Sequence, residues 1–180
     1  LVMQQSWGLR SRESGEPMTP DTIFRIYSMT KPIVCVALMT LHERGLFQLS
    51  DPISRFIPDL ADLRVLARRE GRHELEDPHR PVTIRDLVTH TAGMTYHFYD
   101  YGAVEAQYRR SAVTAELPLE EHVRIIADLP LAFHPGTAFR YSVAHDVIGH
   151  LVQVLADEPL DRYLDRAIFQ PLGMQDTGFW

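Results

Sequence analysis

The longest apolar run of the chain lies near its start, and it predicts the central element of the fold. Residues 33–39 are apolar without interruption, which is typical of a helix that is buried on every side. We expect this helix to span residues 29–44 and to end at Gly45, a residue that commonly follows the last helical turn. Pro32 is compatible with the helix because it falls in the first turn.

Apolar and polar positions predict several shorter elements around this helix. Thr83 and Asp86 have the spacing of a capping box, which starts a helix that stops near Gly93. Ser142 precedes a strongly amphipathic pattern that predicts another helix. The other expected elements are a strand over 21–27, a short helix that starts at 49–52 and is closed by Pro58, and helices over 119–129 and 160–168.

Two stretches lack a clear period. Residues 59–80 are polar and rich in arginine, and we interpret them as a surface loop or a weak helix. Residues 95–112 contain five aromatic side chains without a helical period, which suits either the wall of a pocket or a surface loop anchored by its rings. No repeat or linker is evident, so residues 1–180 are expected to form a single domain.

Composition narrows the functional classes. The net charge is -6 without a basic stripe, which argues against a nucleic-acid partner. The single cysteine, Cys35, excludes an internal disulfide framework, and no apolar run reaches the roughly 18 residues that a membrane span needs. We therefore expect a cytoplasmic protein, or a periplasmic one if a leader has been removed. Nothing in the sequence sets an oligomeric state.

The candidate chemistry lies where the central helix begins. Ser28 and Lys31 are three residues apart and would share one helix face. Lys31 is the only lysine, since every other basic side chain is an arginine, and arginine does not deprotonate in proteins. Burial that lowered the pKa of Lys31 by about 3 would leave a neutral amine beside a hydroxyl, which is a nucleophile–base pair. The alternative is a helix start that is merely capped by Ser28 or Thr30.

Three motifs occur together: Ser28-Met29-Thr30-Lys31, a Thr-His-Thr-Ala-Gly segment over 89–93, and Tyr141-Ser142-Val143 before a helix. With them the chain resembles the serine β-lactamase and penicillin-binding-protein superfamily, and most of all the carboxylesterases related to class C β-lactamases (family VIII esterases). The likeness includes His134-Pro135-Gly136 and the closing Pro171-Leu172-Gly173-Met174. It implies an α+β, β-lactamase/transpeptidase-like fold, of which this chain is mainly the helical lobe with a few strands of the antiparallel sheet.

The resemblance also implies roles for individual residues. Ser28 would be the nucleophile, Lys31 its base, and Tyr141 would carry a proton to the leaving group. The backbone N–H of Ser28 would form half of an oxyanion hole. We further expect the substrate pocket to include Tyr96, Tyr99 and Val143.

Other chemistries find less support. His90 could suggest a serine–histidine pair, but the family uses this segment to shape the helical lobe, so we interpret His90 as structural. No G-x-S-x-G surrounds any serine. The nine histidines include no H-E-x-x-H, so we expect neither a metal site nor a cofactor.

Two departures from the family pattern bear on function. Val143 stands where β-lactamases usually have an asparagine, and a side chain without hydrogen-bonding groups shifts the expected substrate from a lactam to an ester. The third motif of the family would lie beyond residue 180, so the chain is expected to be a fragment.

The hypothesis is therefore a serine hydrolase that acts through an acyl-enzyme on short-chain esters. The alternatives are a β-lactamase or D-Ala-D-Ala carboxypeptidase with the same intermediate, and a non-catalytic receptor or interaction module.

Overall fold

The computed structural model describes residues 2–111, 113 and 117–179, and the chain divides into the units Leu1–Thr30 and Lys31–Trp180. In the first unit, Leu9 and Pro17 form an isolated antiparallel bridge, and Tyr27–Met29 is a 3-10 turn. The strand predicted over 21–27 is wrong. Residues 23–26 are irregular backbone, since no neighbouring strand among the described residues supplies hydrogen-bond partners.

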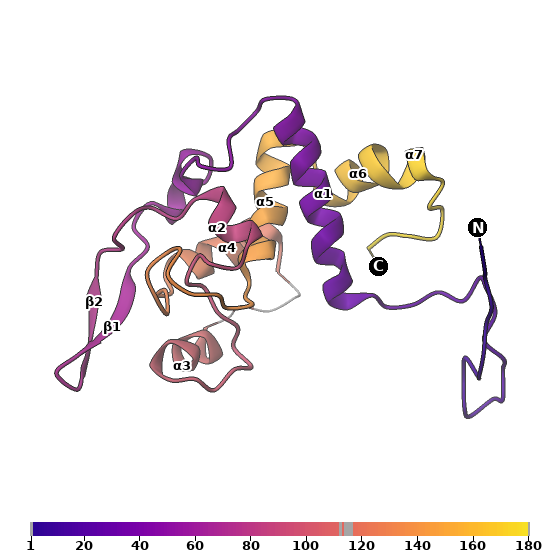
Figure 1. Ribbon diagram of the computed structural model, residues 1–180, viewed down its shortest axis with the longest axis horizontal. Coiled ribbons are helices and arrows are strands. Elements are labelled where there is room, and N and C mark those ends of the chain that lie inside the picture. Colours follow the sequence, from indigo (N-terminus) through magenta and orange to yellow (C-terminus); the bar gives the residue numbers. More distant parts are fainter. Residues whose placement is uncertain (1, 112, 114–116, 180) are drawn as a thin grey trace. The chain divides into compact units, whose positions relative to one another are not determined.

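The second unit is mainly helical (Figure 1). Its helices are α1 (Thr30–Glu43, which begins at the last residue of the first unit), α2 (Ile84–Val88), α3 (Ala103–Arg110), α4 (Leu119–Ala127), α5 (Ala144–Ala156), α6 (Leu160–Leu164) and α7 (Gln170–Leu172), with a π-helical turn at Asp165–Phe169. Short 3-10 turns at Ile53–Arg55 and Pro58–Leu60 replace the helix expected after residue 49. α3 corrects the prediction that residues 95–112 contain no helix.

Helix α1 has nearly the predicted bounds, and Gly45 follows it with φ +75°. The expectation of burial on every side is wrong. Val34, Ala37, Leu38 and Leu41 are buried at helical spacing, whereas Val36 on another face is 53% exposed. One stripe of α1 therefore packs on the core.

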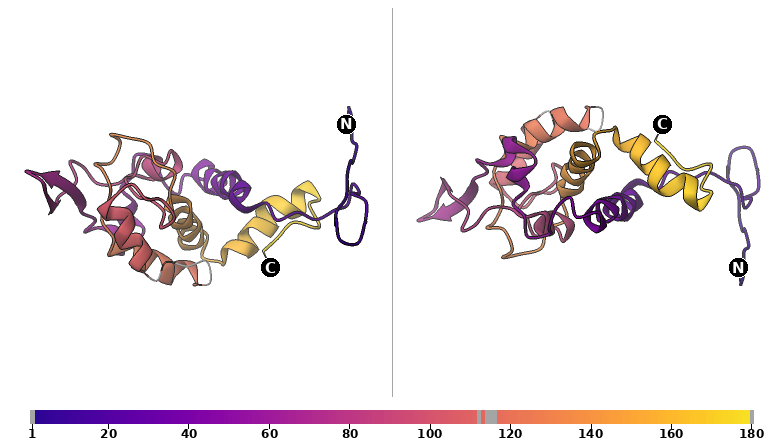
Figure 2. Two further views of the ribbon diagram at one scale, coloured as in Figure 1. Left: turned by 90° about the horizontal axis from the view of Figure 1, so that it is seen from below. Right: turned by 90° about the horizontal axis from the view of Figure 1, so that it is seen from above.

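A β-hairpin occupies part of the stretch that we expected to be a loop or a weak helix. Strands β1 (Val65–Arg69) and β2 (Arg72–Glu76) pair antiparallel, and Figure 2 shows the hairpin projecting from the helices of its unit. The two turn residues, Glu70 and Gly71, have φ of +49° and +83°, as a type I′ turn requires. A Gly between two short alternating runs was the signal that the polar composition concealed.

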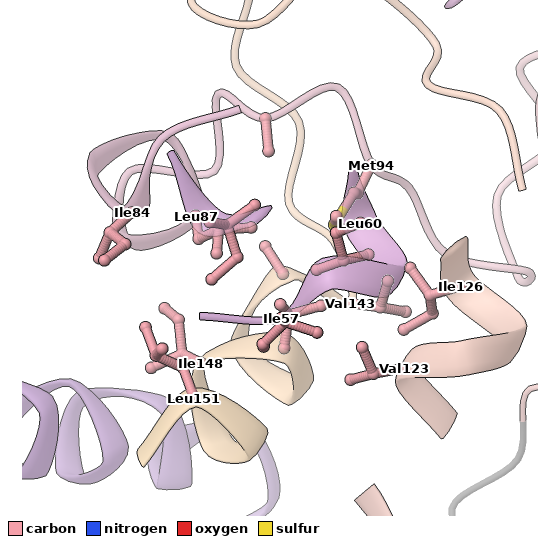
Figure 3. Packing of buried hydrophobic residues seen from close by; sticks show 14 of the residues in the cluster. Ile57, Leu60, Ile84, Leu87, Met94, Val123, Ile126, Val143, Ile148 and Leu151 are labelled. Carbon is pink, nitrogen blue, oxygen red and sulfur yellow. The ribbon is translucent and has the colours of Figure 1, made fainter. Parts of the chain in front are cut away.

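The core of the second unit joins segments that are distant in sequence. Ile57, which lies between the two 3-10 turns, and Leu60 of the second turn lie among side chains of three helices (Figure 3). These are Ile84 and Leu87 of α2, Val123 and Ile126 of α4, and Ile148 and Leu151 of α5, all at most 1% exposed. Burial of this apolar surface holds the helices that carry the site in place.

The predicted capping box at α2 is confirmed. Asp86, only 3% exposed, accepts hydrogen bonds from the Thr83 N–H (2.9 Å) and from both terminal nitrogens of Arg80 (2.6 and 2.8 Å). Burial alone would raise the pKa of Asp86, but the hydrogen bonds from Arg80 and Thr83 outweigh it and lower the pKa to about 2. A charged carboxylate is therefore built into the fold.

Asp86→Asn is expected to destabilise the chain by about 2 kcal/mol at pH 7, because it removes the charge of the buried carboxylate that accepts hydrogen bonds from Arg80 and Thr83. The measurement is the free energy of urea unfolding at pH 7 and pH 3. Since the folded pKa lies below the unfolded one, the carboxylate stabilises the fold above about pH 4 and loses this effect as the pH falls toward 2. The difference between wild type and variant should therefore shrink at pH 3. An equal difference at both pH values would contradict the assignment, and exposed Asp59→Asn is the control.

Candidate active site

Residues 90–95 and residues 140–143, which overlap two of the family motifs, lie against each other in the second unit. The N–H of Arg140 donates to the carbonyl of His90 (2.8 Å), and the N–H of Val143 donates to the carbonyl of Thr95 (3.4 Å). Between them, the N–H of Ser142 donates to Nδ1 of the His90 ring (3.2 Å). These bonds fix the backbone on both sides of Tyr141.

The glycines of these motifs are needed for close packing. A Cβ on Gly93, whose φ is +91°, would lie 2.3 Å from the carbonyl oxygen of Phe133. A Cβ on Gly136, whose φ is +83°, would lie 2.3 Å from the Arg80 guanidinium. Gly93 therefore combines a left-handed backbone with a backbone contact that leaves no room for a side chain, whereas at Gly136 the end of the Arg80 side chain can move and the left-handed backbone alone favours glycine.

Lys31 and Tyr141 come together as the motifs predict. The Nζ of Lys31 lies 4.7 Å from the centre of the Tyr141 ring and 5.6 Å from that of Tyr96, and it takes part in hydrogen bonds with both phenols. The two rings are 5.6 Å apart. Tyr96, which we expected only as part of a pocket wall, is thus a direct neighbour of the lysine.

The predicted lowering of the Lys31 pKa is wrong. Burial lowers the pKa of Lys31, as expected, but the hydrogen bonds with Tyr141 and Tyr96 outweigh burial and raise the pKa above its ordinary value. Lys31 is therefore an ammonium at neutral pH. Sequence reasoning considered burial and did not include the second phenol, which stabilises the charged form.

The His90 ring also packs against Tyr141. The two rings are 4.7 Å apart, His90 is only 7% exposed, and its backbone φ is +56°. Burial, together with the nearby charge of Lys31, lowers the pKa of His90 to about 4. Because its Nδ1 accepts from Ser142, the neutral ring carries its proton on Nε2. These contacts agree with the structural role expected for His90.

A second buried imidazole continues the network. His145 lies 4.3 Å from His90 between ring centres, and its Nε2 is 3.2 Å from Sγ of Cys35 on α1. Burial lowers the pKa of His145 to about 4 and raises that of the Cys35 thiol. The group is thus a set of neutral side chains packed behind Tyr141.

The aromatic residues predicted for the substrate pocket line two different hollows. Tyr99 and Tyr141, with Tyr101, Phe139 and Arg140, line one of about 310 Å³. Tyr96 and Val143 line another, of about 250 Å³. Val143 itself is only 1% exposed, so it contributes to the base of its hollow.

The arginine beside the tyrosine is anchored by a carboxylate that sequence reasoning missed. Arg140 Nη1 donates to Glu105 of α3 (2.6 Å), which is 2% exposed and also accepts from the Thr95 hydroxyl (2.9 Å). Since a buried Glu in an otherwise amphipathic helix gives no distinctive pattern, its partner could not be inferred from spacing.

Ser28 belongs to the first unit and lies in the 3-10 turn directly before α1. Tyr27, the residue before it, has a φ of +45°. A bulky non-glycine residue in the left-handed region is strained, and such strain is concentrated at functional sites.

Two further features of the described residues bear on the class of protein. Among residues 2–111, 113 and 117–179, no three side chains of the types that bind metals are grouped so as to hold an ion. None of the helices in these ranges combines the length and the apolar character that crossing a membrane requires.

The chain belongs to the β-lactamase family, whose sequence model matches residues 1–180. Esterase EstB of Burkholderia gladioli is 37% identical over 99% of the chain, and a lovastatin esterase of Penicillium rubens is 32% identical over 100% of it. The solved structure of EstCE1, described as a hydrolase with promiscuous acyltransferase activity, is 34% identical and superposes on 92% of the chain with a TM-score of 0.76. The β-lactamase/transpeptidase-like fold expected from the motifs is confirmed.

The chain spans less than half the length of these relatives. It corresponds to 44% of EstB, 46% of the lovastatin esterase and 42% of the EstCE1 chain. This agrees with the expectation that the sequence is part of a longer polypeptide.

Proposed function

We propose that this chain carries the nucleophile and base of a serine carboxylesterase that acts on short-chain esters through an acyl-enzyme. The observation that carries the proposal is the placement of Lys31 against Tyr141 and Tyr96. Because Lys31 follows Ser28 by three residues, the hydroxyl and the amine belong to one continuous piece of chain. The similarity to two esterases supports an ester as the substrate.

In the proposed reaction, Ser28 Oγ attacks the ester carbonyl carbon and its proton passes to the Lys31–Tyr141 pair. Lys31 takes up this proton after the pair has lost one to solvent, since the resting amine is charged. Tyr141 then gives a proton to the alcohol as the carbon–oxygen bond breaks. Water attacks the acyl-Ser28 ester in a second step that returns the hydroxyl and releases the acid.

The backbone N–H of Ser28 is proposed as one donor to the oxyanion. The substrate is a small-molecule ester, and Tyr96, Tyr99 and Val143 are proposed to contact it. A cytoplasmic location remains a proposal that rests on the single cysteine.

Labelling with a fluorophosphonate tests the nucleophile. In the full-length protein we expect one label, which peptide mass spectrometry places on Ser28, and we expect Ser28→Ala to abolish both labelling and hydrolysis of p-nitrophenyl butyrate. Ser50→Ala, an exposed serine outside the site, is the matched control and should label normally. A label on any other residue would refute the assignment.

The alternatives give different results in the same assay. A β-lactamase or peptidase would hydrolyse a chromogenic cephalosporin faster than the p-nitrophenyl ester. A non-catalytic receptor would produce no burst of p-nitrophenol with any acyl substrate.

A further inference from the structure

A hollow of about 250 Å³ next to Tyr96 has polar groups that the proposed reaction does not use. Its apolar wall consists of Val113, Leu117, Leu119 and Val143, and its remaining lining residues are Tyr96, His97, His122 and Asp146. An apolar cavity of about 150 Å³ holds a benzene molecule, so this hollow has room for a short acyl chain. Tyr96 joins it to the reaction centre, because Tyr96 also contacts Lys31.

One of the polar residues, His122, lacks a partner that its burial calls for. His122 is 7% exposed, and its Nε2 has no hydrogen-bond partner among the described residues. Asp146 is half-buried, and its carboxylate interacts with its own backbone N–H and with the charges of His122 and Lys31. A buried polar atom left without a partner is unfavourable, so Nε2 of His122 favours a ligand that pairs with it beside the Asp146 carboxylate.

The charges here select the kind of ligand. Burial raises the pKa of Asp146, opposed by the charges of His122 and Lys31, and burial lowers the pKa of His122, opposed by Asp146. An ammonium group placed against Asp146 would be repelled by Lys31, whose positive charge reaches this carboxylate. A hydroxyl is uncharged, and it can donate its one proton to the Asp146 carboxylate while its oxygen accepts from an Nε2–H of His122.

We infer that this hollow is the acyl-group subsite and that it selects acyl chains bearing a hydroxyl, which would bind between Asp146 and His122. The inference rests on the proposed esterase function and names its substrate class, esters of short hydroxy acids. The hydroxyl would donate to Asp146 and pair with His122, and the carbon chain would contact Val143 and Leu119.

Paired substrates test the subsite in the full-length protein. We expect kcat/KM for p-nitrophenyl 3-hydroxybutyrate to exceed that for p-nitrophenyl butyrate about tenfold, because a site that hydrogen-bonds a hydroxyl discriminates against its absence. The ratio should fall to about one in His122→Leu and in Asp146→Asn. His150→Leu is the matched control, since His150 is another partly buried histidine with an unpaired Nδ1 that does not line the hollow. This control should keep the wild-type ratio.

Binding to Ser28→Ala, measured by calorimetry, decides the question without turnover. Tighter binding of 3-hydroxybutyrate than of butyrate, lost in the His122→Leu double variant, supports the subsite. Equal binding of the two acids, or a substrate ratio that the variants do not change, overturns it. If the wild type hydrolyses neither ester and the fluorophosphonate does not label Ser28, the proposed function fails, and the binding comparison still tests the subsite. Preference for p-nitrophenyl 4-aminobutyrate would assign the hollow to a cation and also overturn the inference.

Discussion

Lys31→Arg is expected to lower kcat/KM for p-nitrophenyl butyrate by about 10²- to 10⁴-fold in the full-length protein, the range of a positioned acid–base group. Arginine keeps the positive charge and can still donate to Tyr141 and Tyr96, but it cannot release a proton at any working pH. The variant therefore separates the role of the charge from the role of the base. Steady-state kinetics give the comparison, and circular dichroism checks that the fold is unchanged.

The pH profile of the wild type tests the same assignment. Because the pKa of Lys31 is raised, only a small fraction of this lysine is a neutral amine at pH 7, and this fraction grows about tenfold for each pH unit. We expect kcat/KM to rise through pH 6–9 without a plateau. A plateau near pH 7.5 would show that the amine is already neutral. Arg166→Lys, an exchange of exposed cations at a surface ion pair with Glu158, is the control and should follow the wild-type profile.

Sequence reasoning succeeded where a local pattern determines the outcome. The bounds of α1, the capping box of α2 and the helices after residues 118 and 142 follow from periodicity, caps and turns within a few neighbouring residues. The meeting of Lys31 with Tyr141 was predicted from motif order alone, across more than a hundred residues. Local spacing could not have supplied it.

The failures share a physical cause, which is dependence on tertiary partners. The pKa of Lys31 depends on Tyr96, and nothing in the sequence places that phenol at the amine. The face of α1 that carries Val36 was predicted to be buried because its residues are apolar. An apolar sequence does not show whether another element packs against that face. The β1–β2 hairpin was missed because five residues of its two strands are arginine or glutamate, which conceals the alternation.

Acid is expected to unfold the chain through the neutral imidazoles behind Tyr141. An unfolded histidine takes up a proton near pH 6.5, whereas His90 and His145 in the fold do so only at about pH 4. Unfolding between these pH values therefore takes up protons, so the free energy of unfolding falls as the pH drops from about 6.5 to about 4. Protonation of one of these two histidines lowers the free energy of unfolding by about 3 kcal/mol over this pH range.

Urea unfolding at pH 7.5 and pH 4.5 measures this loss, and His90→Asn identifies its source. An asparagine Oδ1 can accept from the Ser142 N–H in place of Nδ1, and asparagine tolerates the left-handed backbone that His90 adopts. The variant should lose less stability between the two pH values, by about 3 kcal/mol, while His73→Asn in the exposed hairpin should behave like the wild type. An unchanged pH dependence in His90→Asn would contradict the assignment. The expected result would show that the ring supporting Tyr141 must stay neutral, because a charged His90 would add a second cation beside Lys31 and lose the acceptor that fixes the backbone at Ser142.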